Sequence, residues 1–510
     1  MSSINSFPDD HAAADPQRTA YQIDGGRAVS YAELVDSSRR IARLLGERGL
    51  RRGDVVAILL PNMAGLFEVA WACQRSGLRY TAISNRLNAQ DVAYILSDSG
   101  ARELITCAEL GELAGAALAL LEAPPSAISV DGGLAGADAL PELLETVGTE
   151  PLLEECEGTD LLYSSGTTGR PKGVAPQLTA APLGQAPGIA PFLQETWEFG
   201  PDTVYLCPAP LYHSAPLRFS MAVQRFGGTV VVMERFDAAR CLELIEAHQI
   251  THVQMVPTMF IRLLALEESV RSDARLSSLR AVIHAAAPCP PAVKQAMIAW
   301  LGPIVDEYYA GTENYLMTLI RSEEALRRPG SVGRPLIGSP RILGEDGELL
   351  GPGVSGEIWS EGGLEFSYLN APEKTAASRN DRGWSTAGDL GYLDEDGYLY
   401  ISDRRDDLII SGGVNIYPLE AENVLIGHEA VADVAVIGVP HPELGAEVRA
   451  VVHLAPGRQR GDDLEQQLIA YCQQALSRYK CPRSIDFVDS VPRTPTGKLM
   501  RREVRAAYGV

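Results

Sequence analysis

The sequence lacks any run of eighteen apolar residues, so a helix that spans a membrane is not expected. Its first residues, MSSINSFPDDHAAADP, lack the basic start and apolar core of a secretory signal. The last residues, AAYGV, lack a peroxisomal SKL-type address. The 8 cysteines include no CxxC pair, which argues against a zinc site and a disulfide framework. Together these absences predict a cytoplasmic protein with no integral membrane segment.

Basic residues are outnumbered by acidic ones: the chain has 44 lysines and arginines and 66 aspartates and glutamates, which gives a formal net charge of −22. Long-range electrostatics therefore disfavours nucleic acids and anionic membranes as partners. An anionic small-molecule substrate has to be attracted by local basic groups. With 510 residues and 46% hydrophobic content, the chain is long enough for at least two domains with separate cores. A homodimer is left open by these numbers.

Alternating patterns predict the fold of the N-terminal part. Short apolar runs typical of buried strands alternate with helical patterns, and Ser30 and Asp237 are the expected N-caps of two helices. This alternation predicts parallel sheets with helical crossovers, in which ligands bind beyond the carboxyl ends of the strands. Those ends are expected at residues 256–258, 284–288 and 309–313. The predicted strands are 54–61, 251–257, 279–288 and 304–313, and the predicted helices are 29–49, 63–77, 236–249, 259–268 and 290–301.

A change of pattern near residue 404 marks a second domain. After the charged run SDRRDD, a compact mixture of helices and strands extends over roughly a hundred residues, which is typical of a separate α+β domain. The predicted fold class is therefore α/β. It consists of a large N-terminal domain of stacked doubly wound sheets, residues 1–404, and a smaller α+β C-terminal domain, residues 405–510.

The segment YSSGTTGRPKG, residues 163–173, follows a short apolar run and combines glycines, hydroxyl groups and one lysine. Glycines let the backbone approach a ligand closely, while hydroxyls and a lysine can hold phosphate oxygens. It is not a Walker A loop, because GxxxxGK followed by Ser or Thr does not occur. Without further context, such a segment is more typical of a flexible surface turn. The candidate phosphate-binding residues are Ser164, Ser165, Gly166, Thr167, Thr168, Gly169 and Lys172.

The full string resembles the phosphate loop of the adenylate-forming superfamily, which comprises acyl-CoA synthetases, peptide-synthetase adenylation domains and beetle luciferases. Further blocks extend this resemblance over nearly the whole chain. The chain is identified as a member of this superfamily, in its acyl-CoA synthetase branch, and the resemblance implies ATP, Mg²⁺ and coenzyme A as cofactors. The blocks are PLYHSAPL (210–217), HAAAP (284–288), YYAGTE (308–313), STAGDLGYLDEDGYLYISDRRDD (385–407), IISGGVNIYPLEAE (409–422) and PRTPTGKLMRRE (492–503).

The resemblance implies nucleotide-binding roles for residues in these blocks. Tyr309 would stack on adenine, and Ala286 belongs to the turn that cradles adenine, where alanines stand in two glycine positions of the family. Thr312 would bond the α-phosphate. Glu313, together with Thr168, would hold Mg²⁺, and a carboxylate suits a hard cation beside phosphate oxygens.

The block at 385–407 resembles the ribose-binding and hinge region of the family. Asp389 would accept hydrogen bonds from both ribose hydroxyls, since an ionised carboxylate only accepts. Arg404 matches the second ribose contact. Asp406 falls on the hinge residue, about which the smaller domain would be mobile.

The C-terminal blocks resemble elements that serve the two half-reactions. Lys498 occupies the place of the adenylation lysine, which offsets the repulsion between a carboxylate and a triphosphate and would stabilise the transition state by about 2.7–4 kcal/mol. Ser411, Gly412 and Gly413 would line a narrow channel for the pantetheine arm. Lys480 lies where relatives contact the CoA nucleotide.

The acyl group would lie beside His213, which borders the acyl pocket in relatives and would gate it or orient the carboxylate. No acidic side chain in these blocks is placed to meet an α-ammonium group, so an amino-acid substrate is disfavoured. A fatty or similarly bulky acid, including a sterol side-chain carboxylate, ranks first and an aryl acid of cinnamate or benzoate type second. The expected wall consists of Phe219, Gln254, Val256, Pro257, His284, Ala285, Asn314 and Tyr315, which are mainly apolar.

The implied function is an ATP-dependent carboxylic acid:CoA ligase that acts through an acyl-adenylate. Three alternatives stay open. An adenylation enzyme could load a carrier protein in trans, a luciferase-like oxygenase would share the nucleotide motifs, and a catalytically inactive protein could merely bind. The joint presence of Glu313, Asp389, Arg404 and Lys498 argues against the inactive protein.

Overall fold

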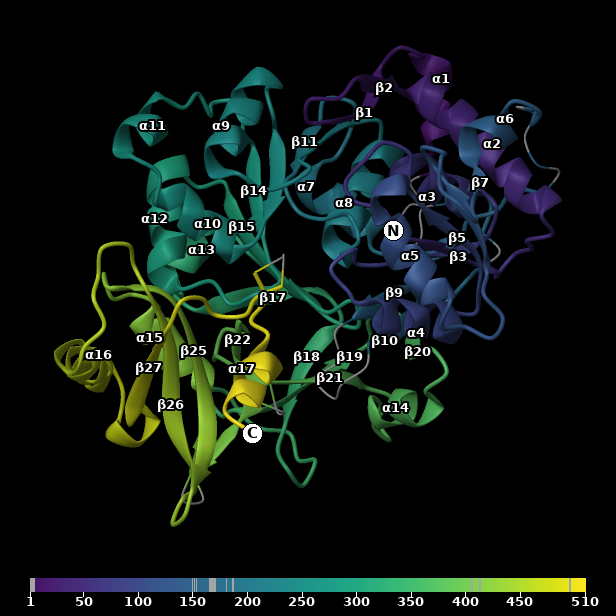
Figure 1. Ribbon diagram of the computed structural model, residues 1–510. Coiled ribbons are helices and arrows are strands. Elements are labelled where there is room, and N and C mark those ends of the chain that lie inside the picture. The colour runs from purple at the N-terminus through teal and green to yellow at the C-terminus, as the bar shows by residue number, and fades with distance from the viewer. Residues whose placement is uncertain are drawn as a thin grey trace.

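The computed structural model describes residues 5–148, 150, 152, 154–164, 171–179, 181–185, 188–404, 407–411, 414–494 and 497–510, with backbone only at 403, 404 and 415. Figure 1 shows a larger N-terminal part coloured purple to green and a smaller C-terminal part coloured yellow-green to yellow. None of the described helices is long and apolar enough to cross a membrane.

The N-terminal part contains a parallel sheet of six strands in the order β7-β6-β5-β3-β4-β8. Its helix α3 is buried along its whole length, and its three polar residues, Glu68, Gln74 and Arg75, are buried with hydrogen-bond or ion-pair partners. The strands are β3 (Val55–Ile58), β4 (Arg79–Ala82), β5 (Ala101–Thr106), β6 (Ser126–Ser129), β7 (Asp138–Ala139) and β8 (Thr159–Asp160). The helices are α1 (Pro8–Ala14), α2 (Tyr31–Glu47), α3 (Leu66–Arg75), α4 (Ala89–Ser99), α5 (Gly111–Leu118) and α6 (Leu140–Leu144).

A second sheet of thirteen strands runs in the order β18-β19-β21-β22-β17-β16-β15-β14-β13-β11-β12-β1-β2. From β1 to β15 its neighbours are parallel, as the alternation predicts. These strands are β1 (Thr19–Ile23), β11 (Val204–Cys207), β12 (Thr229–Val232), β13 (His252–Met255), β14 (Ala281–His284) and β15 (Val305–Ala310), with β2 (Ala28–Ser30) antiparallel at the edge.

Helices cover both faces of this parallel half. One buried cluster joins the strands to α7 (Ala190–Trp197) and α8 (Ser214–Arg225). A second cluster, on the opposite face, joins them to α9 (Ala238–Ala247), α10 (Pro257–Leu264) and α12 (Pro291–Leu301). Doubly wound packing of this kind places the ligand-binding edge at the ends of the strands. Helix α11 (Glu268–Asp273) lies between α10 and α12 in the chain.

The other half of the large sheet is antiparallel. The sequence analysis does not predict it. Its strands are β16 (Met317–Ile320), β17 (Ser331–Ile337), β18 (Ser339–Leu343), β19 (Gly356–Glu361), β21 (Ser385–Leu393) and β22 (Leu399–Arg404). Two short helices, α13 (Ser322–Arg327) and α14 (Pro372–Ala377), lie in its connections. A separate small sheet, β20-β10-β9, is formed by β9 (Leu162–Ser164), β10 (Lys172–Pro176) and β20 (Phe366–Tyr368).

The C-terminal part has its own sheet and buried cluster. Its strands are β23 (Ile409–Ser411), β24 (Val414–Ile416), β25 (Val431–His441), β26 (Gly445–Leu454) and β27 (Ser484–Val488). Its helices are α15 (Pro418–Leu425), α16 (Asp462–Ala475) and α17 (Arg501–Ala507). This mixture confirms the predicted α+β character of the smaller part.

Two helix starts confirm the expected caps. Ser30 Oγ accepts a hydrogen bond of 3.2 Å from the backbone N–H of Glu33, and the Ser30 N–H donates to Glu33 Oε2 at 2.8 Å. This reciprocal capping box satisfies two backbone donors at the start of α2. Asp237 likewise accepts from the N–H of Arg240 at 2.8 Å and starts α9.

Candidate active site

The carboxyl ends of β13, β14 and β15 lie side by side, as the sequence predicts. In the sheet register, His284 is the partner of both Met255 and Glu307. The segments that follow these strands therefore leave the sheet at one edge. In the turn after β14, Ala286 has a φ of 74°, a left-handed conformation that favours glycine. The turn thus keeps a glycine-like backbone although an alanine stands in it.

A β-hairpin carries the predicted phosphate loop. Ser164 at the end of β9 and Lys172 at the start of β10 are partners in the register, so the two ends of the loop are held together. The Lys172 Nζ lies 5.5 Å from the centroid of the Tyr368 ring on β20. The other candidate residues of this loop lie outside the described residues: Ser165, Gly166, Thr167, Thr168 and Gly169.

The predicted metal ligand Glu313 lies next to this hairpin. Its Oε1 accepts a hydrogen bond of 2.8 Å from the hydroxyl of Tyr368, the same side chain that contacts Lys172. Thr312, the residue before Glu313, has its hydroxyl 3.5 Å from Ser214 Oγ at the start of α8. The small sheet, the end of β15 and α8 therefore meet at one place.

This arrangement fits a Mg²⁺ ion shared with a nucleotide. Among the residues that the structure describes, no group of three or more His, Cys, Asp or Glu side chains is arranged to hold a metal. Magnesium in nucleotide sites is usually held by one or two carboxylates together with phosphate oxygens. A single carboxylate, that of Glu313, beside the phosphate-loop lysine meets this requirement.

Tyr309 and Asp389, the predicted adenine and ribose residues, are in direct contact. The Tyr309 hydroxyl donates to Asp389 Oδ2 at 2.5 Å and lies 3.4 Å from the hydroxyl of Tyr315. Burial raises the pKa of Tyr309 well above its usual value, and the negative charge of Asp389 adds to this, so the tyrosine stays a donor. Arg404 is the register partner of Asp389 in β22, and its side chain lies outside the described atoms.

Lys498 and His213 come together from opposite parts of the chain. Burial lowers the pKa of His213 to about 4, and the positive charge of nearby Lys498 contributes to this lowering. His213 Nε2 is buried and has no hydrogen-bond partner among the described residues. The lysine-bearing loop is docked on the N-terminal part, because a Cβ atom added at Gly497 would overlap Thr258 Oγ1.

The buried histidines predict a pH dependence of stability. His213 and His252 each have a folded-state pKa of about 4, both chiefly through burial, against an ordinary value of 6.5. Between these values the unfolded chain binds more protons than the folded one, so stability should rise with pH from about 4 to about 6.5. We expect His213→Gln to flatten this rise in denaturant titrations at several pH values. An unchanged slope would contradict the assignment.

A buried ion pair that the sequence patterns do not predict connects α8 and β8 to the segment that carries Thr312. On α8, Arg218 donates to Asp160 on β8 through Nε at 2.6 Å and Nη2 at 3.1 Å. Its Nη1 donates to the Thr312 carbonyl at 3.0 Å. Burial opposes the charge of Arg218, but Asp160 outweighs burial and raises the pKa of the guanidinium. The only sign of this ion pair in the sequence is an arginine within a largely apolar helical stretch.

The predicted acyl wall needs one correction. Side chains alternate between the two faces of a strand, and Gln254 is the register partner of Ile283, whereas Met255 is the partner of His284. His284 therefore lies on the face opposite to Gln254, with its ring 5.0 Å from that of Phe260 on α10. The expectation that His284 lines the same wall as Phe219 is wrong.

The wall on the α8 side is strongly aromatic. Phe219 stacks on Tyr308 with ring centroids 5.6 Å apart, and its centroid lies 5.4 Å from that of Trp197. Trp197 is itself held by a hydrogen bond of 2.9 Å from its indole N–H to Asp306. These rings form a packed, buried aromatic cluster on the α8 side of the sheet.

The candidate residues of the C-terminal part are only partly described. Lys480 forms an ion pair of 2.5 Å with Glu420, so a phosphate group that binds Lys480 has to compete with a carboxylate. Ser411 ends β23 and is the register partner of Val414. Asp406, predicted as the hinge, and Gly412 and Gly413, predicted to line the pantetheine channel, lie outside the described residues.

Two family models match the chain. The first, described as AMP-binding enzyme, covers residues 8–366. The second, described as AMP-binding enzyme C-terminal domain, covers residues 420–498. Their division agrees with the two cores of the structure.

Known proteins match along the full length. Long-chain-fatty-acid–CoA ligase FadD13 from Mycobacterium tuberculosis is 33% identical over 100% of this chain and 99% of its own. Feruloyl-CoA synthase from Amycolatopsis sp. is 36% identical over 99% of each chain. The structure of O-succinylbenzoate coenzyme A synthetase (MenE) from Bacillus subtilis, in complex with ATP and magnesium ion, matches with a TM-score of 0.82 and 29% identity over 98% of this chain and 99% of that one.

Proposed function

Because the chain belongs to the AMP-binding enzyme family, we propose that it joins a bulky hydrophobic monocarboxylic acid to coenzyme A through an acyl-adenylate. The curated relatives FadD13 and feruloyl-CoA synthase are CoA ligases, and the chain is an AMP-forming acid-thiol ligase. The observation that carries the proposal is the approach of Lys498 to His213, with the lysine loop docked against Thr258. This approach brings a cation to the place where a carboxylate and a nucleotide would meet.

The first half-reaction activates the acid. A carboxylate oxygen attacks the α-phosphorus of ATP, the bond to pyrophosphate breaks, and an acyl–AMP anhydride forms. Lys498 would offset the repulsion between the two anionic reactants, while Thr312 would bond the α-phosphate. Lys172 would hold the departing pyrophosphate. Mg²⁺, held by Glu313 and Thr168, would neutralise charge on the phosphate oxygens when bound.

The second half-reaction transfers the acyl group. The thiol of coenzyme A attacks the acyl carbon, and AMP leaves with the electrons of the broken anhydride bond. For this step the C-terminal domain, residues 405–510, would turn about Asp406 and bring the element at 411–413 to the site. Lys480, released from Glu420, would then meet a CoA phosphate.

The apolar wall supports the substrate class. Phe219, Tyr308 and Trp197 are packed rings on the α8 side. The carboxylate that contacts them, Asp306, already accepts from Trp197 and is paired with Arg321, so it is not placed to receive an ammonium group. A fatty or similarly bulky acid fits such a wall. An aryl acid of cinnamate or benzoate type is the second candidate. The aromatic cluster on the α8 side favours it, because an aryl group packs well against aromatic rings.

An acid panel tests the proposal. ATP–pyrophosphate exchange should be stimulated by fatty, aryl or steroidal acids, and the best acid should give an acyl-CoA when coenzyme A is added. A holo-carrier protein offered in place of coenzyme A separates the carrier-loading alternative. Absence of exchange with every acid of the panel would overturn the proposal.

A variant of the docked loop should separate the two half-reactions. Gly497→Ala would place a Cβ atom against Thr258 and keep Lys498 from its position. A misplacement of about 1 Å can cost about a hundredfold in rate. We expect adenylation to fall by up to about that factor, and transfer from a synthetic acyl-adenylate to change far less.

The matched control for this variant is Gly509→Ala. Gly509 also has a positive φ, 71°, but a Cβ atom added there meets nothing within 4 Å. Both variants carry the same backbone strain, so only loss of docking distinguishes them. Equal adenylation rates in the two variants would show that docking of Gly497 on Thr258 is not required.

A further inference from the structure

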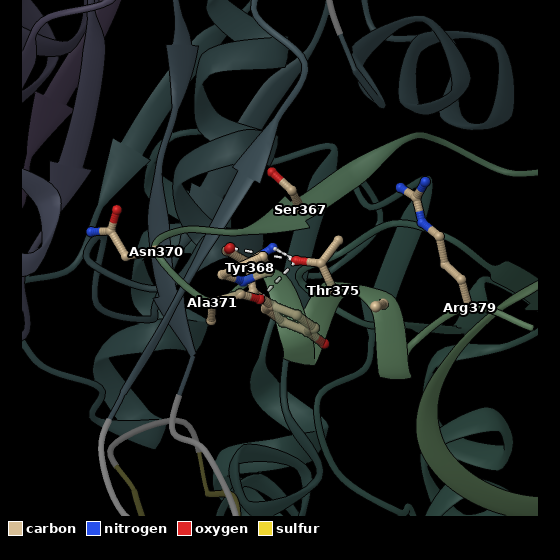
Figure 2. A pocket seen from close by; sticks show the side chains of 8 residues that line it. Ser367, Tyr368, Asn370, Ala371, Thr375 and Arg379 are labelled. Carbon is tan, nitrogen blue, oxygen red and sulfur yellow. Dashed lines mark hydrogen bonds between the residues drawn. The ribbon is translucent and has the colours of Figure 1, made fainter.

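Tyr368 stands between two parts of the site that come from distant segments of the chain. It is the last residue of β20, and Figure 2 shows it from the side of an open pocket formed with α14. No sequence block that resembles the family contains this residue. Its two contacts nevertheless join the predicted metal ligand Glu313 to the phosphate-loop residue Lys172.

The backbone of Tyr368 is fixed on both sides. In the small sheet it is the register partner of Val174 on β10, and the next N–H, that of Leu369, donates to the Gly173 carbonyl at 2.8 Å. On the pocket side the Tyr368 N–H donates to Thr375 Oγ1 at 2.9 Å, as Figure 2 shows. The strand that carries Tyr368 is thus tied to the hairpin that carries the phosphate loop.

The side chain of Tyr368 contacts the carboxylate of Glu313 directly. Its hydroxyl donates to Oε1 at 2.8 Å. The other oxygen, Oε2, lies against Gly311, where an added Cβ atom would be only 2.7 Å away. One oxygen of Glu313 thus already accepts a neutral donor, and the other occupies space that is open because residue 311 has no side chain.

The ring of Tyr368 also contacts the lysine. Lys172 Nζ lies 5.5 Å from the ring centroid, within the range in which an ammonium group is attracted by an aromatic face. One side chain thus limits the positions of a carboxylate and an ammonium group, which would act on the same triphosphate.

We propose that Tyr368 is a positioning residue that sets Glu313 for Mg²⁺ and Lys172 for the leaving pyrophosphate. The inference rests on the proposed function. Partners that hydrogen-bond a metal ligand orient it, and their loss usually costs about ten- to a hundredfold in metal affinity. Tyr368 would act through Glu313 and Lys172 and touch neither the acyl group nor the thiol.

Tyr368→Phe removes the hydroxyl and keeps the ring. We expect the Mg²⁺ concentration for half-maximal ATP–pyrophosphate exchange to rise about tenfold or more, with the KM for the acid unchanged. The same shift should occur in calorimetric titrations with α,β-methylene-ATP at several Mg²⁺ concentrations. Tyr368→Leu, which also removes the ring, should in addition weaken the inhibition of exchange by excess pyrophosphate.

The matched control is Tyr398→Phe. Tyr398 also donates to a glutamate, Glu324 on α13, which follows β16, whereas Glu313 precedes β16, so the two glutamates lie toward opposite ends of that strand. It should lower stability without moving the Mg²⁺ dependence. A Tyr368→Phe protein with the Mg²⁺ dependence of the wild type in both assays would overturn the inference.

The titration with the analogue needs no acid, so its result is independent of whether the acid substrate has been identified. A wild type that binds Mg²⁺ and the analogue but exchanges with no acid would count against the proposed function alone.

Discussion

Lys498→Ala is expected to lower the adenylation rate by about 10²–10³-fold, the usual effect of removing one preorganised donor from a reacting centre. Lys498 lies close enough to His213 to lower the pKa of that histidine, so its charge would act where we propose that the acyl carboxylate binds. Without it, the repulsion between carboxylate and triphosphate is not offset. Exchange between ATP and labelled pyrophosphate measures this step directly.

The Lys498→Ala variant should still catalyse the second half-reaction, the transfer of the acyl group to coenzyme A. A synthetic acyl-adenylate supplies the activated acid, and its attack by a thiol creates no new contact between two anions. We expect transfer to coenzyme A at nearly the wild-type rate. Lys374→Ala, a change at an exposed lysine on α14, serves as the control for loss of a lysine elsewhere. Equal losses in both half-reactions would refute this division of labour.

Asp160→Asn is expected to destabilise the N-terminal domain by about 3–5 kcal/mol, because it leaves the buried charge of Arg218 without its counterion. The two side chains are only 8% and 12% exposed, so water cannot replace the lost partner. Denaturant titration of the variant measures the change. Adenylation should also slow, since Arg218 holds the carbonyl of Thr312.

Two controls separate stability from positioning. Asp24→Asn breaks a similar two-point pair with Arg240, whose side chain is 45% exposed, and should cost no more than about 1 kcal/mol. The double change Asp160→Leu with Arg218→Met replaces both charges by apolar groups and should recover most of the stability. If it also restored adenylation, the hydrogen bond to Thr312 would have no role in positioning.

The parallel half of the fold could be predicted from the sequence because its signals are local. Alternating strands and helices, with Ser30 and Asp237 as caps, are encoded within short windows of the chain. The antiparallel half could not be predicted in this way. Its pairings contain register shifts between β16 and β17, β17 and β22, β19 and β21, and β21 and β22. Each shift interrupts the regular alternation of side chains that reveals a strand.

The sequence motifs also do not show on which face of the sheet a side chain lies. Gln254 and His284 both stand near strand ends at the same sheet edge, and the expected acyl wall includes both. A difference of one position in the register sends them to opposite faces. His284 therefore packs with Phe260 on α10, whereas Phe219 and Tyr308 pack together on the opposite face.

By itself, the sequence determined the family and the groups proposed for the site: glycines and hydroxyls in the predicted phosphate loop, Glu313 beside Thr312, Asp389 and Lys498. These groups stand in contiguous blocks, and the type and spacing of their residues can be seen without coordinates. Only the tertiary structure decided which other side chains support them. Tyr368, Arg218 and Asp160 join the site through strand order and register, and such neighbours across sheets are set by the packing of the whole chain, which no local pattern records.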